Sequence, residues 1–338
     1  MKLSIIVPAY NVADYIERCI RSLENQDMPK EDYEIIVTND GSPDNSRQIV
    51  ENLQKEFSNI VLINQENQGV SMARNNAIAI AKGNYIIPID PDDYVLPNTF
   101  YRVLKLTETD DLDILYLGFE IFDSDNKSIW QTNYIEQKEH LYNGVEGYFQ
   151  PRGFDVKDPD RSVAILYKKS MLDTFAIHYP KDVPYLEDGL FLAKVFAAAE
   201  KVGFDDKKFY QRTTRIGSAT NSKLFYSEQA LQGFIQAIQD IKNFGNQKKL
   251  EGEQAGLINH VVAKFVLLSL SPSMSTFDFK KYFKVIAILK DSDIVKIETQ
   301  GLRLIYLRYA KVYNFSKIIF LFYFRFINSF YFHFKIKA

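Results

Sequence analysis

A short apolar run ends abruptly in three acidic side chains at Tyr85-Ile86-Ile87-Pro88-Ile89-Asp90-Pro91-Asp92-Asp93. This pattern is typical of a buried strand whose carboxyl end opens into a site. Three carboxylates within four residues repel one another, so a divalent cation is a natural partner for them. Oxygen ligands favour Mg²⁺ or Mn²⁺, and the stretch has no His or Cys that would favour zinc. The alternative is a solvated acidic turn whose bend is set by Pro91.

Upstream of this stretch, β-branched runs alternate with segments whose apolar residues recur at helical spacing. Such alternation predicts a mostly parallel α/β sheet with right-handed crossovers and helices on both faces, a Rossmann-like arrangement. The expected strands are Leu3–Pro8, Glu34–Thr38 and Asn59–Asn64, and the expected helices are Ala13–Asn25, 49–57 and Ser71–Lys82.

Polar residues follow the expected strands at the point where each strand ends. They are Pro8, Ala9, Tyr10 and Asn11 after the first strand, Asn39 to Ser42 after the second, and the acidic stretch after the fourth. Because ligands of such sheets bind beyond the carboxyl ends of the strands, these loops predict a nucleotide crevice.

Two residues after the second strand suit contacts with a nucleotide. Asp40 can accept a hydrogen bond from a base N–H, and Gly41 lets the backbone approach a ligand closely. The alternative for Asp40 is an Asx turn that caps the next helix. Arg74, which follows Asn67-Gln68-Gly69, is a forked donor to a phosphate or to the acidic stretch, or else a surface residue of an alanine-rich helix.

Four ordered motifs resemble those of glycosyltransferase family 2, whose nucleotide-sugar domain has the GT-A fold. They are Val7-Pro8-Ala9-Tyr10-Asn11, Ile36-Val37-Thr38-Asn39-Asp40-Gly41-Ser42-Pro43-Asp44, Asn67-Gln68-Gly69 with Ala73-Arg74-Asn75, and Gly83 with Asp90-Pro91-Asp92-Asp93. The resemblance covers about the first 220 residues. It implies that Asp40 binds the uracil of a UDP-sugar, and that Asp90 and Asp92 hold the ribose and the metal on the diphosphate. Asn39 stands where many members have Asp, which puts only the detail of base contact in doubt.

A second acidic site, Glu187-Asp188, precedes the apolar helix expected at Leu190–Ala199. A carboxylate at a helix start is also favoured as a cap. The family resemblance implies instead that Asp188 is the general base that deprotonates the acceptor hydroxyl, with Glu187 in support. Single displacement with one base inverts the anomeric centre.

The segment from Phe209 to Thr220 resembles the aromatic, Arg and Gly-Ser segment of the family. This weaker resemblance implies that Arg212 or Arg215 folds over the diphosphate, and that Ser218 belongs to the same donor-binding loop. The Gln-x-x-Arg-Trp signature of processive members is absent, because Ile216 follows Arg215. The sequence therefore predicts transfer of a single sugar.

Composition places the C-terminus apart from the body. The chain has 338 residues and a net charge of −2, which excludes the basic excess of nucleic-acid binders. After Glu298 there are seven basic residues and no acid, and residues 318–324 are apolar throughout. This run falls short of the roughly 20 apolar residues of a spanning helix, so we expect the tail to lie on a membrane surface. The alternative is an aromatic seam that packs on the body or forms a homodimer.

Cys19, the single cysteine, is expected in the core, and a reducing cytoplasmic location follows from the lack of a disulfide pair and of a leader. The single tryptophan, Trp130, is a candidate for sugar stacking, with plain packing as its alternative.

The sequence thus predicts a metal-dependent inverting glycosyltransferase, at the inner face of the cell membrane, that moves one sugar from a UDP-sugar to a lipid-linked saccharide in surface-polysaccharide synthesis. Its domain is expected over residues 1–225, with nucleotide-sugar binding in 1–110 and the acceptor and catalytic part in 111–225. Helices follow in 226–338, with the membrane-associating tail at 311–338. The alternatives are a nucleotidyltransferase, which would need a glycine-rich basic loop after the first strand, and a catalytically silent carbohydrate-binding partner of a synthase complex.

Overall fold

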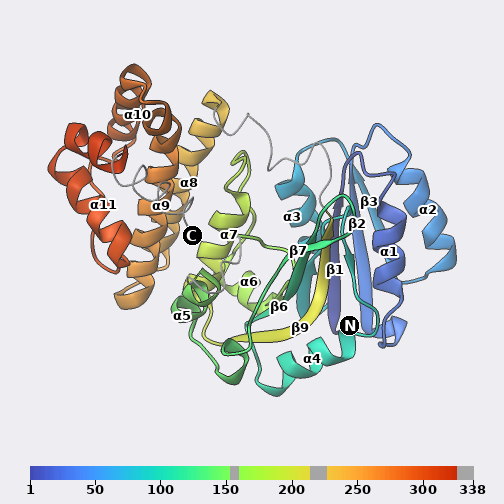
Figure 1. Cartoon of the computed structure of the whole chain (residues 1–338). Coiled ribbons are helices and arrows are strands. Elements are labelled where there is room, and N and C mark those ends of the chain that lie inside the picture. The colour runs from blue at the N-terminus through green and yellow to red at the C-terminus, as the bar shows by residue number, and fades with distance from the viewer. Residues whose placement is uncertain (153–159, 214–226, 326–338) are drawn as a thin grey trace. The chain divides into compact units, whose positions relative to one another are not determined.

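The computed structural model describes residues 1–152, 160–213 and 227–325 of the chain (Figure 1). These residues form two compact units. The first unit takes Met1–Lys181 and Glu187–Asn221, and the second takes Asp182–Leu186 and Ser222–Ala338, in each case as far as the residues are described.

The first unit alternates strands with helices along most of its length. In its first half the elements are β1 (Leu3–Ala9), α1 (Ile16–Glu24), η1 (Lys30–Asp32), β2 (Tyr33–Asp40), α2 (Ser46–Glu56), β3 (Ile60–Gln65), α3 (Val70–Ile80), β4 (Tyr85–Pro88), β5 (Tyr94–Val95) and α4 (Phe100–Thr109). In its second half they are β6 (Ile114–Phe122), β7 (Ser128–Gln131), η2 (Gln137–Glu139), α5 (Gly144–Phe149), η3 (Gln150–Arg152), β8 (Ile165–Lys168), α6 (Lys169–Phe175), α7 (Glu187–Ala198) and β9 (Val202–Thr213).

One mixed sheet organises this unit, with strand order β3-β2-β1-β4-β8-β6-β9-β5 and β7 paired to β6. The four strands expected from the sequence are parallel neighbours, with Ile5 opposite Ile35 on one side and Ile87 on the other. The expected Rossmann-like core is therefore confirmed. Beyond β4 the pairing is mixed, because β8 runs against both β4 and β6, whereas β6 and β9 are parallel.

The apolar residues of β1, β2 and β4 form the core together with the inner side of α1. Figure 1 shows α1 and α2 along one face of these strands and α3 along the other. Cys19 of α1 is fully buried, as the helical spacing predicted. Trp130 packs against the core and meets Phe119 edge to face, so its observed surroundings are those of a packing residue. The carboxyl ends of β1, β2 and β4 consequently share one edge of the sheet.

The second unit is helical in the residues described. Its helices are α8 (Glu228–Gln247), α9 (Gly252–Thr276), α10 (Phe279–Asp291) and α11 (Leu304–Phe315), followed by helical residues 317–325. By length and composition α9 meets the criteria for a membrane span, but 72% of its most apolar window is buried inside the protein. That degree of burial is also found in the central helix of a soluble helical domain.

Candidate active site

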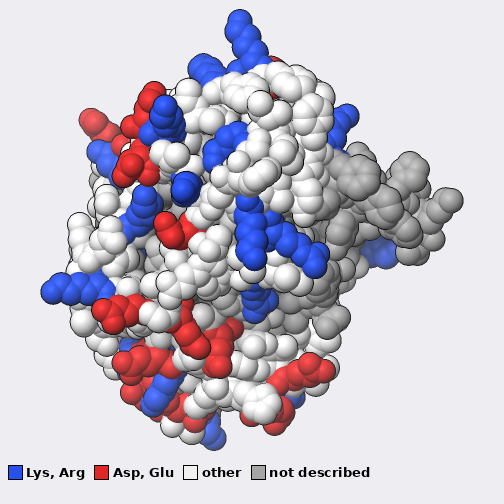
Figure 2. All heavy atoms as spheres, turned by 90° about the vertical axis from the view of Figure 1, so that its left-hand side faces the viewer, with Lys and Arg blue, Asp and Glu red and all other residues white. Residues whose placement is uncertain are grey.

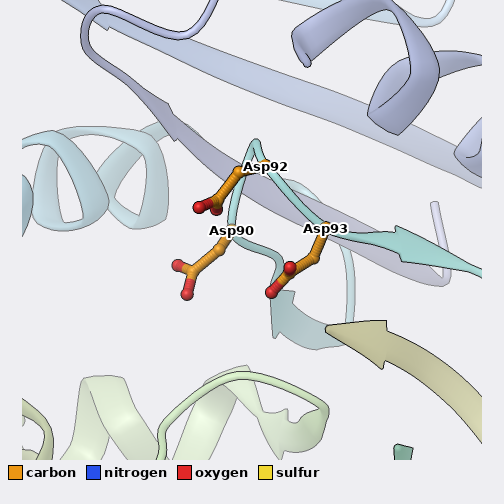
Figure 3. A group of neighbouring side chains, drawn as sticks. All are labelled: Asp90, Asp92 and Asp93. Atoms are coloured by element: carbon orange, nitrogen blue, oxygen red, sulfur yellow. The ribbon is translucent and has the colours of Figure 1, made fainter. Parts of the chain in front are cut away.

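The acidic turn after β4 brings three carboxylates together at the sheet edge (Figure 3). Oxygen atoms of Asp90, Asp92 and Asp93 all lie within 4.8 Å of one another. Figure 3 shows that the side chains of Asp90 and Asp92 project to the same side of the turn. The turn itself continues directly from buried β4, because Ile89 donates its N–H to the carbonyl of Ile6 in β1.

Asp93 ties this turn to the end of β9. The Tyr210 hydroxyl donates to Asp93 Oδ2 at 2.6 Å, and the Thr213 N–H donates to Oδ1 at 2.9 Å. Burial, with the nearby charges of Asp90 and Asp92, raises the pKa of Asp93 to about 8. Since both oxygens of Asp93 already accept hydrogen bonds, Asp90 and Asp92 are the better placed of the three to hold a cation.

Arg18 of α1 also stabilises the turn. Its Nη2 donates to the Asp92 carbonyl at 2.7 Å and to Thr213 Oγ1 at 3.1 Å, and its guanidinium stacks 4.8 Å from the Tyr94 ring. Neither Arg18 nor Thr213 was singled out by sequence reasoning, because their contacts join segments up to 195 residues apart.

Arg74, on α3, lies between the acidic turn and the start of α7. Its Nη2 is 3.0 Å from Asp90 Oδ1, and its Nη1 is 3.0 Å from Asp188 Oδ1. The guanidinium is almost fully buried and stacks 5.0 Å from the Tyr179 ring. Of the partners that the sequence left open, the structure shows carboxylates, and they come from both acidic sites at once.

Asp188, at the start of α7, accepts hydrogen bonds from three donor groups. Besides Arg74, the Ser162 hydroxyl donates to Asp188 Oδ1 at 2.7 Å, and the Ser162 N–H donates to Oδ2 at 3.3 Å. Ser162 is fully buried just before β8, and no sequence signal marked it. The positive end of the helix dipole adds a further favourable field for a carboxylate at this place.

Glu187 sits in a different environment from its neighbour. Its Oε2 is buried without a hydrogen-bond partner among the described residues. Burial and the adjacent Asp188 charge raise the pKa of Glu187 to about 7. The half-buried Glu187 carboxyl group is therefore a weaker acid than an exposed glutamate.

The expected base-binding residue, Asp40, is engaged by its own chain. Asp40 Oδ1 accepts from Gln65 Nε2 at 2.7 Å and from the Gln68 N–H at 2.8 Å, and Oδ2 accepts from the Gly69 N–H at 2.9 Å. These contacts hold the loop that leads into α3, which differs from the helix-capping turn considered from the sequence. Gly41 has a φ of 67°, and a Cβ there would lie 2.9 Å from the Asn67 nitrogen.

The loops after β1 and β2 are joined at the same edge. Pro8 and Ala9 end β1 in buried positions, whereas Tyr10 is half exposed and Asn11 has a φ of 54°. The Asn11 N–H donates to Ser42 Oγ, and Ser42 in turn donates to the Ala9 carbonyl. The residues of the first two motifs therefore lie side by side, as the parallel strands predicted.

The remaining residues predicted to bind the sugar donor lie at the end of β9 or beyond it. Arg212 is the second-last residue of β9, half buried and paired with Ile121 of β6. Arg215 and Ser218 lie outside the described residues, so their roles remain predictions.

A hollow of about 500 Å³ lies elsewhere on the first unit, where β4 begins. Lysines and acids line it in pairs, including Lys168 with Asp111 and Lys169 with Asp173. Because the chemistry of parallel sheets is found at the carboxyl ends of their strands, we assign the active site to the acidic edge instead.

The metal-ligating side chains at that edge suit a hard divalent cation. Asp90 and Asp92 offer carboxylate oxygens, which Mn²⁺ and Mg²⁺ prefer. Burial raises the pKa of Asp90 despite the opposing effect of Arg74, so an added positive charge there would be favourable. The residues present therefore fit the cation that the sequence predicted, without specifying which of the two ions it is.

Comparison with known proteins places this arrangement in a family. The family model for glycosyl transferase family 2 matches residues 4–171, which include β1 to β4 and the acidic turn. Glycosyltransferase EpsJ of Bacillus subtilis, described as uncharacterized, is 34% identical over 62% of this chain and 60% of its own length. The poly(ribitol-phosphate) beta-glucosyltransferase of Bacillus spizizenii is 32% identical over 64% of this chain and 33% of its own length.

These relatives are longer than the matched region, so the chain spans between one third and two thirds of their lengths. Among solved structures, residues 1–349 of Staphylococcus aureus TarS, in complex with UDP-GlcNAc, match with a TM-score of 0.70 at 20% identity. That match covers 93% of this chain and 88% of the TarS chain, and it concerns the GT-A fold. Motifs, family model and fold agree, and the chain belongs to glycosyltransferase family 2.

Proposed function

We propose that this protein is a metal-dependent inverting glycosyltransferase that transfers a single sugar from a UDP-sugar to a lipid-linked saccharide in the assembly of a cell-surface glycan. The observation that carries the proposal is the position of Arg74, which contacts Asp90 of the acidic turn and Asp188 at the start of α7, each at 3.0 Å. The residues proposed to bind the donor's diphosphate and the residue proposed as base thus belong to one cluster.

In this mechanism Asp188 takes the proton of the acceptor hydroxyl as that oxygen attacks the anomeric carbon. The new bond forms on the face opposite the nucleotide, the bond to the diphosphate breaks with its electron pair, and the anomeric centre inverts. Ser162 and Arg74 hold the Asp188 carboxylate in a fixed orientation during this step. Asp90 and Asp92 would hold a Mn²⁺ or Mg²⁺ ion, which would supply positive charge to the leaving diphosphate.

The relatives support the choice of donor and acceptor class. The Bacillus spizizenii relative is named for glucosyl transfer to poly(ribitol-phosphate), and TarS is named for N-acetylglucosaminyl transfer to the same type of polymer. TarS was also solved with UDP-GlcNAc. These names favour a nucleotide-sugar donor and a cell-envelope polymer as acceptor, and a location at the inner face of the membrane accords with both.

Hydrolysis of UDP- and GDP-sugars, measured with Mn²⁺ present or chelated, tests this proposal. We expect Asp92→Ala to lose Mn²⁺-dependent donor binding. Asp188→Asn should keep donor binding and lose transfer by about 100-fold to 10,000-fold, which is the range for loss of a general base. Asp125→Asn, an exposed carboxylate in the turn before β7, serves as the control and should behave as wild type.

Transfer at the wild-type rate by both site variants would refute the assignment of the site. The two rival functions predict other results. A silent carbohydrate-binding partner would show no change in thermal stability with nucleotide and Mn²⁺, and a nucleotidyltransferase would release pyrophosphate from a nucleoside triphosphate.

A further inference from the structure

Large apolar side chains are exposed close together on the second unit. They are Phe279 and Phe283 of α10, Phe315 at the end of α11, and Ile318, Ile319 and Phe322 in the helical residues 317–325. Phe315 is 80% exposed and Phe322 is 50% exposed. Single exposed apolar residues are ordinary, but a contiguous group of them marks an interaction surface.

Ring contacts within this group join α10 to the last described helix. The rings of Phe279 and Phe322 are 6.1 Å apart, and Phe277 lies against both, at 4.9 and 5.4 Å. The Tyr282 hydroxyl donates to the Lys317 carbonyl at 2.8 Å, which fixes α10 beside the start of the last described helix. Ile318 and Ile319 precede Phe322 by four and three residues and therefore share its helix face. We call these six exposed side chains, together with Lys280 and Lys284 of α10, the apolar-basic face.

The charge around this face has one dominant sign. Residues 279–325 contain ten lysines and arginines and three acids, whereas residues 1–278 contain 29 basic and 40 acidic residues. Eight of these ten cations are exposed, namely Lys280, Lys284, Lys290, Lys296, Arg303, Arg308, Lys311 and Arg325. Figure 2, which views the side that carries α10 and α11, shows lysine and arginine side chains among uncharged surface, with acidic side chains also present on this side.

We propose that the apolar-basic face docks onto a lipid bilayer that contains anionic lipids. Phenylalanine and isoleucine side chains enter the boundary between headgroups and acyl chains, where burial of apolar area is favourable. Each cation near an anionic surface adds on the order of 1 kcal/mol to binding. The two contributions come from neighbouring positions on the same helix, as Phe279 with Lys280 and Phe283 with Lys284 show.

Charge complementarity favours lipid over other occupants. A second copy of the chain would bring cations such as Lys280 and Lys284 against cations of the same sign, which opposes self-association through this face. An acidic bilayer offers both an apolar interior and a negative surface. The surface differs from the tail expected from the sequence, because α10, which lies before that tail, forms part of it. The inference does not depend on the proposed enzymatic activity.

Flotation of the full chain with vesicles tests this inference. We expect binding to vesicles of phosphatidylcholine and phosphatidylglycerol, weaker binding to phosphatidylcholine alone, and release at high salt because exposed charges are screened. Phe315→Ser/Ile318→Ser/Phe322→Ser should lower the bound fraction by about tenfold or more through lost apolar burial. Lys280→Glu/Lys284→Glu should lower binding to the anionic vesicles only.

The matched control is Tyr101→Ser/Ile129→Ser/Ile135→Ser, which removes three exposed apolar side chains of similar exposure (62%, 58% and 61%) from the first unit. This control should bind as wild type, and thermal unfolding should show that all variants are folded. Wild-type binding by the triple variant on the apolar-basic face would overturn the inference. So would a wild-type protein that stays free of anionic vesicles, whether it runs as a monomer or as a dimer in size-exclusion chromatography with light scattering.

Discussion

The acidic turn after β4 and the acidic start of α7 hold their carboxylates in different ways. In the turn, Asp93 is bound by a hydroxyl and a backbone N–H, which carry no charge, and its pKa rises to about 8. At the start of α7, Asp188 accepts hydrogen bonds from the Arg74 guanidinium and the Ser162 hydroxyl. It also lies in the favourable field at the N-terminal end of the helix dipole. Arg74 contacts Asp90 of the turn as well as Asp188, but three carboxylates crowd the turn, so we propose a cation at the turn and a base at the helix start.

Replacement of Arg74, which contacts both acidic sites, should have the largest effect on stability. Arg74→Ala leaves Asp90 and Asp188 facing each other without compensation, so we expect the free energy of unfolding to fall by about 2 to 3 kcal/mol. This figure is below that of a fully buried pair, because the side chains of Asp90 and Asp188 are 36% and 29% exposed. Urea unfolding measures the loss.

The control for this variant is Arg47→Ala on α2, whose ion pair with Glu51 lies on the surface. That control should change stability by less than about 0.5 kcal/mol. Equal losses for the two arginines would show that Arg74 does not compensate the two acidic sites.

A smaller and more selective effect should follow Ser162→Ala. This change removes a hydrogen bond to the Asp188 carboxylate at the helix start and leaves the turn untouched. We expect a stability loss of about 1 to 2 kcal/mol and a kcat lower by about tenfold, since Asp188 becomes less well oriented. The Mn²⁺ concentration that gives half-maximal activity should stay unchanged.

Ser58→Ala, an exposed serine after α2, is the control and should match wild type in all three measurements. A changed Mn²⁺ requirement in Ser162→Ala would mean that the turn and the helix start are not separate in their roles.

The smallest expected effect concerns Glu187 and depends on pH. Its pKa in the folded protein, about 7, lies above its ordinary value, so folding favours the protonated form. Raising the pH from 5 to 8 ionises Glu187 in the folded protein and lowers stability. In Glu187→Gln this loss should disappear. Between pH 5 and pH 8 the free energy of unfolding of wild type should therefore fall by on the order of 1 kcal/mol more than that of the variant.

Thermal unfolding at both pH values measures this difference, with the exposed Glu66→Gln as control. A parallel pH dependence of wild type and Glu187→Gln would show that Glu187 does not hold its proton more tightly in the fold.

The parallel half of the sheet was predictable because its strands are short runs rich in β-branched residues, and β2 and β4 end at Asp40 and Pro88. The helix expected at Ser71–Lys82 appears as Val70–Ile80. β9 was missed because Asp205, Asp206, Lys207 and Lys208 interrupt its apolar pattern. These charged residues are accommodated by partners on other elements, as in the pair of Lys208 with Glu120, which no local pattern reveals.

The site divides in the same way. The family resemblance singled out Asp90, Asp92 and Asp188, which follow a strand or lie at the start of a helix, and Arg74 in the second turn of α3. Ser162 and Tyr179 reach the cluster only through the packing of β8 and the segment before α7, so their sequence neighbourhoods carry no signal. Asp40 was predicted to face a ligand, whereas its partners in the loop before α3 lie 25 to 29 residues further along the chain.

The bracing of that loop by Asp40 has a mechanical consequence. Its carboxylate fixes Gln68 and Gly69, Gly69 is the residue on which α3 begins, and Arg74 lies in the second turn of the same helix. A ligand that takes the place of Gln68 or Gly69 at Asp40 would therefore loosen the start of α3, the helix that carries the Arg74 guanidinium. We therefore expect a ligand bound at Asp40 to shift the helix turn that holds Arg74 against Asp90 and Asp188.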